Sequence, residues 1–365
     1  MDLTYRSAGV DTRKQDDVME TVFGLLRRTW SDREHVQLDF GHFANVISIG
    51  SLGVAMSTDG IGTKAIIAQL IGKYDTVGID CVAINVNDVL CVGAEPLSLV
   101  DYLAVQTIRP EMVSDIAKGL SAGGMLAKIS IAGGESAQLP ELIKGEEEGG
   151  GFDLAGTCIG AVELASIITG KSIEPGDVIL GIPSSGVHCN GLTLARKALG
   201  ITDDKSLKER RAALSIYEPE LGETIGEALL TPTRVYTEEV LCLIRNNIDV
   251  RGIAHITQDG FLNLPRLESG VGYVIDTPPE PQPIFRMIQK AGGITDQEMY
   301  EVFNMGTGLC VVVSAPQADE ALSLFKGISD SVSVIGHTTP DSNRSVDIPH
   351  LSMSGIRGSG FQKAH

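Results

Sequence analysis

Apolar and polar positions alternate along the chain with two periods, that of a helix and that of a strand, which predicts a mixed α/β protein. In the first half, apolar residues recur at helical spacing over 17–30 and 111–126. The run VGIDCVAINVNDVLCV, residues 77–92, is apolar at most positions and predicts a buried helix. Short apolar runs predict strands at 53–57, 97–105, 129–132 and 153–162.

A turn-rich connector, ITGKSIEPGD, separates this pattern from a second one, which begins with the strand VILGI at residue 178. We therefore expect two mixed α/β units, 1–165 and 166–340. Residues 341–365 are polar and rich in Ser and Gly, which favours a loosely held tail. The second unit alternates predicted strands, near 272–275 and 309–313, with predicted helices, near 191–199, 220–230, 233–246, 283–291 and 316–327.

The charge balance limits the partners of this protein. Its 365 residues include 29 Lys and Arg against 47 Asp and Glu, a formal charge of −18. A chain this acidic should repel nucleic acid and anionic membranes, so we expect neither as a partner. Phosphates would have to be bound locally, by backbone N–H groups, a few cationic side chains or a bridging metal.

The cysteines and the N-terminal residues favour a cytoplasmic location. No two cysteines form a C-x-x-C pair, so we expect reduced thiols and neither a zinc site nor a disulfide framework. The start, MDLTYRSAGVDTRKQ, has no apolar segment of the secretory type. No apolar run reaches the roughly 18 residues that a membrane span needs. The six cysteines are Cys81, Cys91, Cys158, Cys189, Cys242 and Cys310.

The stretch STDGIGTK is a candidate phosphate loop. Gly60 and Gly62 allow a tight turn and a close backbone approach to a ligand. Thr63 begins an apolar helical run, whose first N–H groups would attract an anion, and Lys64 adds a positive charge. Asp59 would repel a phosphate unless Mg²⁺ lies between them. An ordinary strand-to-helix turn, with a capping Asp and a surface lysine, explains the same residues equally well.

The predicted buried helix carries a second group of polar residues. Asp80, Asn87 and Asp88 are spaced i, i+7, i+8 and share one helical face. An unpaired carboxylate on a buried helix is costly, so something should compensate it. We favour Mg²⁺, which prefers oxygen ligands, as the compensating group. The alternative is that these residues cap neighbouring backbone or pair with an arginine.

Two further stretches offer polar groups at the ends of predicted strands. In IAGGESAQLP, Glu135 would follow a short strand and two glycines and could be a third metal ligand, although a plain turn is equally compatible. GIPSSGVHCNG predicts a strand, a polar glycine loop and a helix, which is a second geometry for binding anions. His188 in this loop could bind a phosphate or transfer a proton, but a lone histidine is more often structural. GIAHITQDGFLNLPR, residues 252–266, has the same order of strand, polar loop and helix.

Taken in order, these motifs resemble the aminoimidazole ribonucleotide synthetase family, the phosphoribosylformylglycinamidine cyclo-ligases of purine biosynthesis. The resemblance spans roughly residues 4–336, from TYRSAGVD through STDGIGTK, GGESAQLP, SSGVHCNG, LLTPTRVY and GIAHIT to EMYEVFNMGTG. Several pieces are shared with selenophosphate synthetase and thiamine-phosphate kinase. AGVD, SSGVHCNG and TPTRVY together indicate the purine member.

The resemblance implies a PurM-like fold of two α/β (α+β) domains, with N-terminal strands forming a central β-barrel across a homodimer. It implies ATP and Mg²⁺ as cofactors and phosphoribosylformylglycinamidine as substrate. ATP phosphorylates the formyl oxygen, an amidine nitrogen attacks the activated carbon, and phosphate leaves as the imidazole ring closes. Such chemistry depends on positioning and charge neutralisation, and nothing in the chain resembles a Ser–His–Asp or Cys–His arrangement.

The resemblance also implies roles for individual residues. The metal and polyphosphate would lie near Asp59, Asp88 and Glu135. The catalytic group would include Lys64, and the base would be Asp88 or His188, between which the sequence does not decide. The residues that would bind ATP phosphates are Asp59, Gly60, Gly62, Thr63 and Lys64, and those that would bind substrate are Ser184, Ser185, Gly186, His188 and Asn190.

The chain departs from the family pattern at several positions. Gln258 and Asp259 stand where the family commonly has glycines after AHIT, and there they would crowd and repel a phosphate. Gln138 replaces a usual Glu, Cys189 replaces a usual Ser, and FGHFANV replaces a glycine-rich segment near residue 40. These changes leave two other hypotheses open: a superfamily enzyme with a different amide or phosphate acceptor, or a nucleotide-binding paralogue without turnover. The metal count, the subunit that completes each ATP site and contacts with other pathway enzymes also stay open.

Overall fold

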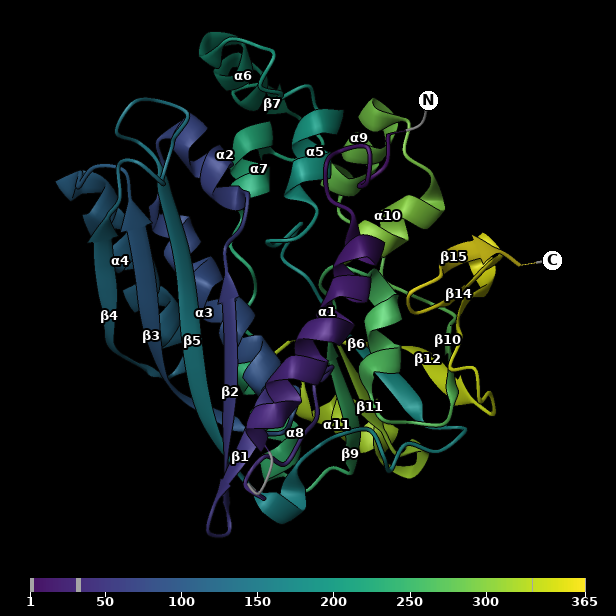
Figure 1. Cartoon of the computed structure of the whole chain (residues 1–365). Helices are drawn as coiled ribbons and strands as arrows, with labels where there is room; N and C mark the ends of the chain where they lie inside the picture. Colours follow the sequence, from purple (N-terminus) through teal and green to yellow (C-terminus); the bar gives the residue numbers. More distant parts are fainter. Residues whose placement is uncertain (1–2, 31–33, 330, 365) are drawn as a thin grey trace.

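The computed structural model describes residues 3–30, 34–329 and 331–364 of the chain. Two sheets lie side by side, one in each half of the sequence, and both are flanked by helices (Figure 1). Among the described helices, none has both the length and the apolar character needed to cross a membrane. The division into two domains at about residue 165 stays a prediction.

The first half is a five-stranded sheet with helices α3 and α4 packed on one face (Figure 1). The strand order is β1–β2–β5–β3–β4, antiparallel except for β3 and β4, which are parallel because α4 crosses between them. Its elements are α1 (Thr12–Leu26), η1 (Arg27–Trp30), β1 (Asn45–Ile49), β2 (Leu52–Gly60), α2 (Lys64–Ile71), α3 (Asp75–Leu90), β3 (Glu95–Val105), α4 (Pro110–Ala127), β4 (Ser130–Gln138), β5 (Phe152–Glu163) and η2 (Leu164–Ser166).

The second half is an eight-stranded sheet in the order β15–β14–β13–β10–β12–β6–β11–β9. Every residue of β11 is buried, as expected for the apolar run at its centre. Its strands are β6 (Val178–Pro183), β9 (Val250–His255), β10 (Gly272–Ile275), β11 (Thr307–Val313), β12 (Ser333–Thr339), β13 (Val346–Ile348), β14 (Met353–Ile356) and β15 (Gly360–Lys363), with a separate pair β7 (Tyr217–Glu218) and β8 (Glu223–Thr224). Its helices are α5 (Leu192–Ala198), α6 (Leu207–Leu214), α7 (Ile225–Leu230), α8 (Thr237–Arg245), η3 (Gly260–Arg266), α9 (Pro283–Gly292), α10 (Asp296–Val302), η4 (Ala315–Gln317), α11 (Ala318–Leu324) and η5 (Pro349–Leu351).

Two of the sequence-based predictions are wrong in detail, and one helix was not predicted. The strand expected at 129–132 continues to Gln138 and is largely exposed, because β4 is an edge strand. The tail expected to be loosely held forms β13–β15, and Phe361 is buried there. Helix α6 was not predicted, although Ser206 and Glu209 form a capping box at its start.

Helices α3 and α4 approach each other through glycines. A Cβ atom on Gly78 would collide with the backbone of α4, and one on Gly119 with the backbone of α3. This contact holds α3 against the sheet, and α3 carries Asp80, Asn87 and Asp88 into the junction of the two halves.

We predict that Gly119→Ala lowers the free energy of unfolding by about 2–3 kcal/mol, because the methyl group forces the two backbones apart. Urea unfolding followed by circular dichroism measures this. Gly24→Ala is the matched control: Gly24 lies in α1 with nothing within 4 Å of the added Cβ, so it should be neutral or stabilise by ~0.5–1 kcal/mol. Equal stability of the two variants would contradict the prediction.

Candidate active site between the two halves

A fully buried ion pair joins the first half of the chain to the second. The side chains of Lys64 on α2 and Asp80 on α3 are 0% exposed, and Nζ lies 2.9 Å from Asp80 Oδ2. Nζ also donates to the carbonyl of Thr231 at 2.7 Å. Asp80 Oδ1 accepts hydrogen bonds from the backbone N–H of Thr233 at 2.7 Å and from its hydroxyl at 2.6 Å.

This arrangement changes the interpretation of Lys64 and Asp80. The carboxylate of Asp80 is compensated by an ion pair and not by a metal. The sequence left such pairing open as the alternative, with an arginine as the expected partner, but the partner is Lys64. Lys64 is directed at Asp80 and Thr231 and not into the loop 59–63. Its predicted contact with a phosphate therefore stays a prediction, and the structure gives this lysine a different partner.

The candidate phosphate loop has the expected local geometry. Gly62 has a φ of 59°, a left-handed conformation that favours glycine. Thr63 is the residue that precedes α2, and its hydroxyl lies 3.1 Å from that of Thr193 on α5. Gly60 belongs to the end of β2, where its N–H donates to Asp59 Oδ1 at 2.7 Å. The loop thus ends against the second half of the chain.

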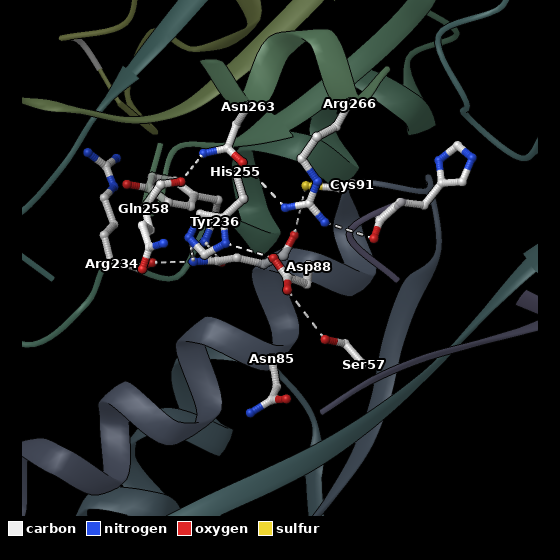
Figure 2. Close-up of polar contacts among 12 residues, drawn as sticks. Ser57, Asn85, Asp88, Cys91, Arg234, Tyr236, His255, Gln258, Asn263 and Arg266 are labelled. Carbon is white, nitrogen blue, oxygen red and sulfur yellow. Dashed lines mark hydrogen bonds and ion pairs between the residues drawn. The ribbon is translucent and has the colours of Figure 1, made fainter. Parts of the chain in front are cut away.

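Asp88 lies at the centre of a polar network across the junction (Figure 2). His255, at the end of β9, places Nδ1 2.9 Å from Asp88 Oδ1. The hydroxyl of Ser57 on β2 lies 3.4 Å from the other carboxylate oxygen. The Nδ2 group of Asn87 lies 3.4 Å from His255 Nε2, which assigns the donor N–H of this ring to Nδ1, facing the carboxylate. His255 is 1% exposed, so the pair holds Asp88 in a fixed direction.

Asn87 extends the same network to the segment 231–236. Its Nδ2 donates to the carbonyl of Arg234 at 2.9 Å, and its Oδ1 accepts the N–H of Tyr236 at 3.1 Å. The guanidinium of Arg234 donates to Glu239 and Ser329 and lies over the ring of Tyr236. Arg234 and His255 are site residues that the sequence-based assignment left out. Two stretches of the sequence could have pointed to them: TPTRVY contains Arg234, and His255 ends the strand at GIAH.

Asp59 is the solvent-accessible carboxylate of this site. Partial removal from water, and secondly the negative charge of Asp88, raise the pKa of Asp59 to about 6. A divalent cation bound between two such carboxylates would neutralise their mutual repulsion, and carboxylate oxygens are the ligands that Mg²⁺ prefers. Among residues 3–30, 34–329 and 331–364, however, no group of three His, Cys, Asp or Glu is arranged to hold a metal.

Glu135 does not join Asp59 and Asp88 within one chain. The register aligns Gly60, Ala155, Tyr102 and Glu135 across the sheet, three interstrand spacings of ~4.8 Å or about 14 Å in all. Asp59 precedes Gly60, so its side chain is on the opposite face from that of Glu135. Glu135 is also inside β4 and not at a strand end, which corrects the sequence-based expectation.

The loop 184–190 is held by its own buried histidine. The N–H of Ser185 donates to His188 Nε2 at 3.2 Å, and the hydroxyl of Ser185 donates to the carbonyl of Pro232. His188 is 3% exposed and has a φ of 63°. Burial, with positive groups nearby, lowers the pKa of His188 well below its usual range. These contacts are those of a structural histidine that shapes the loop.

The other residues predicted to bind substrate surround this histidine. Ser184 is buried, and its N–H donates to the carbonyl of Gly306. Ser185 is exposed, Gly186 has a φ of 155°, and Asn190 is half-buried. The loop therefore presents Ser185 and Asn190 to solvent, and its contact with substrate stays a prediction.

Known proteins similar to this chain indicate its family. Family models described as AIR synthase related protein, N-terminal domain and C-terminal domain, match residues 41–162 and 174–348. A phosphoribosylformylglycinamidine cyclo-ligase of Methanothermobacter thermautotrophicus is 44% identical over 337 residues, 92% of this chain and 94% of the relative. One of Thermococcus kodakarensis is 47% identical over 327 residues, 88% of this chain and 92% of the relative.

Solved structures share the fold at low sequence identity. A HypE–HypF complex contains a chain with a TM-score of 0.63 and 16% identity, covering 91% of this chain and 98% of the other. AaThiL, in complex with AMPPCP and TMP, has a TM-score of 0.60 and 16% identity, covering 93% of this chain and 94% of the other. These likenesses show that the fold is of the PurM-like type.

We predict that Lys64→Met lowers the free energy of unfolding by about 3–5 kcal/mol, because it leaves the carboxylate of Asp80 buried without its cation. Denaturant unfolding measures the loss. The control is Lys73→Met, whose pair with Asp75 is about half exposed and should contribute less than about 1 kcal/mol. If Lys64→Met kept full stability, the buried pair would not have the structural role described above.

We also predict a pH dependence that comes from Asp59. Its folded pKa of about 6 lies above the ordinary 3.8, so the folded state binds this proton more tightly than the unfolded state does. The stability from this proton is present below about pH 4 and is lost as the pH rises to about 6. The melting temperature of the wild type should therefore fall relative to that of Asp59→Asn across this interval. Asp88→Asn should reduce the effect, and a constant difference would contradict it.

Proposed function

The chain belongs to the AIR synthase related family, the family of the phosphoribosylformylglycinamidine cyclo-ligases, and we propose that it closes the ring of phosphoribosylformylglycinamidine to aminoimidazole ribonucleotide, with ATP converted to ADP and phosphate. The observation that carries this proposal is identity of 44–47% over about nine tenths of the chain to relatives of that name. The site residues Asp59, Asp88 and His255 all lie within the ranges that the two family models match.

The site supports ATP chemistry through its charge. Its carboxylates would repel a polyphosphate, and burial together with the nearby charge of Asp88 raises the pKa of Asp59. We propose that Asp59 and Asp88 hold Mg²⁺, with phosphate oxygens among the remaining ligands. Bound Mg²⁺ would neutralise the phosphates and increase the electrophilicity of the γ-phosphorus. AMPPCP in AaThiL supports a nucleotide in this fold.

Asp88 is the better of the two candidates for the base that takes a proton from the attacking amidine nitrogen. Its side chain is 18% exposed and is oriented by His255 and Ser57. His188, by contrast, is buried, and its Nε2 already accepts the N–H of Ser185. We assign one oxygen of Asp88 to the proposed Mg²⁺ site and the other to taking this proton, and we assign His188 to shaping the loop.

We propose that the protein forms a homodimer. Val100 and Tyr102 on β3 and Ile159 on β5 are 40–46% exposed. The register places all three on the face of the first sheet opposite α3 and α4. An apolar sheet face left in water favours association with a second copy. Glu135 belongs to the same face, so any contribution it makes to a metal site would come from the second copy. A cytoplasmic location is also part of the proposal, supported by six free cysteines.

The enzymatic proposal is tested by incubating the protein with phosphoribosylformylglycinamidine, ATP and Mg²⁺ and measuring both ADP and aminoimidazole ribonucleotide. We expect the two products in equal amounts. ADP without the ribonucleotide product would favour another acceptor. ATP binding without turnover would favour a paralogue that lacks activity.

Within this assay, Asp59→Asn and Asp88→Asn should each reduce turnover by about a hundredfold or more, because each removes a carboxylate from the proposed cation site. Asp115→Asn is the control, since Asp115 is on the outside of α4 and pairs with Lys118. Circular dichroism should show all three variants folded. Normal turnover in both site variants would disprove the metal assignment.

The dimer is tested by Val100→Glu combined with Tyr102→Glu, which places charges on the apolar face. Sedimentation should change from a dimer to a monomer of 38.7 kDa. Ile328→Glu, at a 41% exposed apolar position in the second half, should leave the dimer intact. A monomeric wild type would contradict the proposed assembly.

A further inference from the structure

Two pockets of opposite charge lie at the two ends of η3, the short helix that follows His255. Asp259 immediately precedes η3, and Arg266 is its last residue. The pocket at the Asp259 end has a volume of about 240 Å³, and the one at the Arg266 end about 860 Å³. The charges that line these pockets decide where an anionic ligand can bind.

The smaller pocket is unsuitable for a phosphate. Its lining includes four carboxylates, Asp11, Asp259, Glu298 and Glu301, against one arginine, Arg6. An unprotected phosphate placed there would be repelled. The excess of carboxylates in its lining, Asp259 among them, therefore disfavours a phosphate at this end of η3.

The larger pocket has the opposite character. It lies between α1, η3 and the C-terminal strands, and it is lined by Arg27, Arg266, Arg344 and Arg357. Glu20 is the carboxylate among its described lining residues. Four guanidinium groups on one pocket are unexpected in a chain with a formal charge of −18.

Three of these arginines have no carboxylate partner. Arg27 pairs with Asp39 at 2.9 Å, but within the described part of the chain Arg266, Arg344 and Arg357 form no ion pair. Burial lowers the pKa of Arg266, and the positive charge of Arg357 lowers it further. The Nε of Arg344 is buried and has no hydrogen-bond acceptor among the described residues.

The fold brings these groups to one pocket. Arg266 donates to the carbonyls of Gly41 and His42 at 3.0 and 2.8 Å, contacts that orient its guanidinium without pairing it to a carboxylate. Arg344 and Arg357 come from the segment that forms β13–β15, so pairing of these strands brings them to the pocket. Guanidinium groups bind phosphate oxygens in a bidentate manner and need no metal to do so.

One arginine of this pocket also interacts with the candidate active site. Arg266 and Asp88 interact electrostatically, and Figure 2 shows the two side chains near each other. A ribonucleotide with its phosphate against the arginines could therefore extend its amide end towards Asp88.

We propose that Arg266, Arg344 and Arg357 bind the 5′-phosphate of the ribonucleotide substrate, in a pocket separate from the site of the ATP phosphates. This inference rests on the proposed function, because it assumes that the substrate is a ribonucleotide. It assigns the C-terminal strands to substrate binding, in a segment whose composition predicted a loose tail.

The test is the double variant Arg344→Gln/Arg357→Gln in the full-length protein. We expect its KM for phosphoribosylformylglycinamidine to rise at least about tenfold, with kcat within about threefold and the KM for ATP unchanged. The wild type should prefer this substrate over its phosphate-free riboside, and the double variant should lose most of this preference. Arg286→Gln/Lys290→Gln, on the exposed face of α9, removes the same charge and should change none of these values.

A second measurement does not need turnover. By titration calorimetry, ribose 5-phosphate should bind the wild type more tightly than ribose does, and the double variant should not distinguish them. An unchanged substrate KM with the preference for phosphate retained would overturn the inference, and so would a rise in the KM for ATP alone. If the wild type failed to convert the substrate, the proposed function would fail. The calorimetric comparison would still decide whether the pocket binds a phosphate.

Discussion

The buried pair of Lys64 and Asp80 determines how the two halves of the chain meet. Both side chains are fully buried, and both are hydrogen-bonded to the segment that begins at Thr231. Because a buried charge without its partner costs several kcal/mol, this segment cannot separate from α2 and α3 without losing stability. Asp88 lies two turns further along α3 than Asp80, and the same docking brings it to His255. The geometry of the site therefore depends on a pair that need not touch a ligand.

Local charge has to overcome the overall charge of this protein. The chain as a whole is strongly acidic, yet its proposed ligands are phosphates. At the junction, the proposed Mg²⁺ on Asp59 and Asp88 would neutralise a polyphosphate that these carboxylates otherwise repel. Beyond η3, unpaired arginines provide the positive charge directly. Arg266 belongs to the arginine pocket and also interacts electrostatically with Asp88, so it links the proposed phosphate pocket to the proposed cation site.

The fold was predictable where burial is complete and unpredictable at sheet edges. The apolar runs of α3 and β11 predicted both elements, since each is buried along nearly its whole length. Edge strands are different, because what makes them strands is a distant partner and not their own composition. β4 pairs with β3 across α4, and β13 pairs with β10, which ends more than 70 residues earlier in the chain. The polar composition of residues 341–365 consequently predicted a loose tail, although this segment forms the short strands β13–β15.

The sequence by itself determined the family and the kinds of residue at the site, because motif order and residue type do not depend on knowing the contacts. It also pointed to Asp59 and Asp88 as candidates, since a carboxylate beside a glycine turn and one on an apolar helix both need compensation. Only the tertiary structure decided which group compensates each charge. Lys64 faces Asp80, and the side chain of Glu135 lies on the opposite face of the sheet from that of Asp59. The reason is physical: the energy of a charge depends on its neighbours in space, and those neighbours come from segments that are far apart in the sequence.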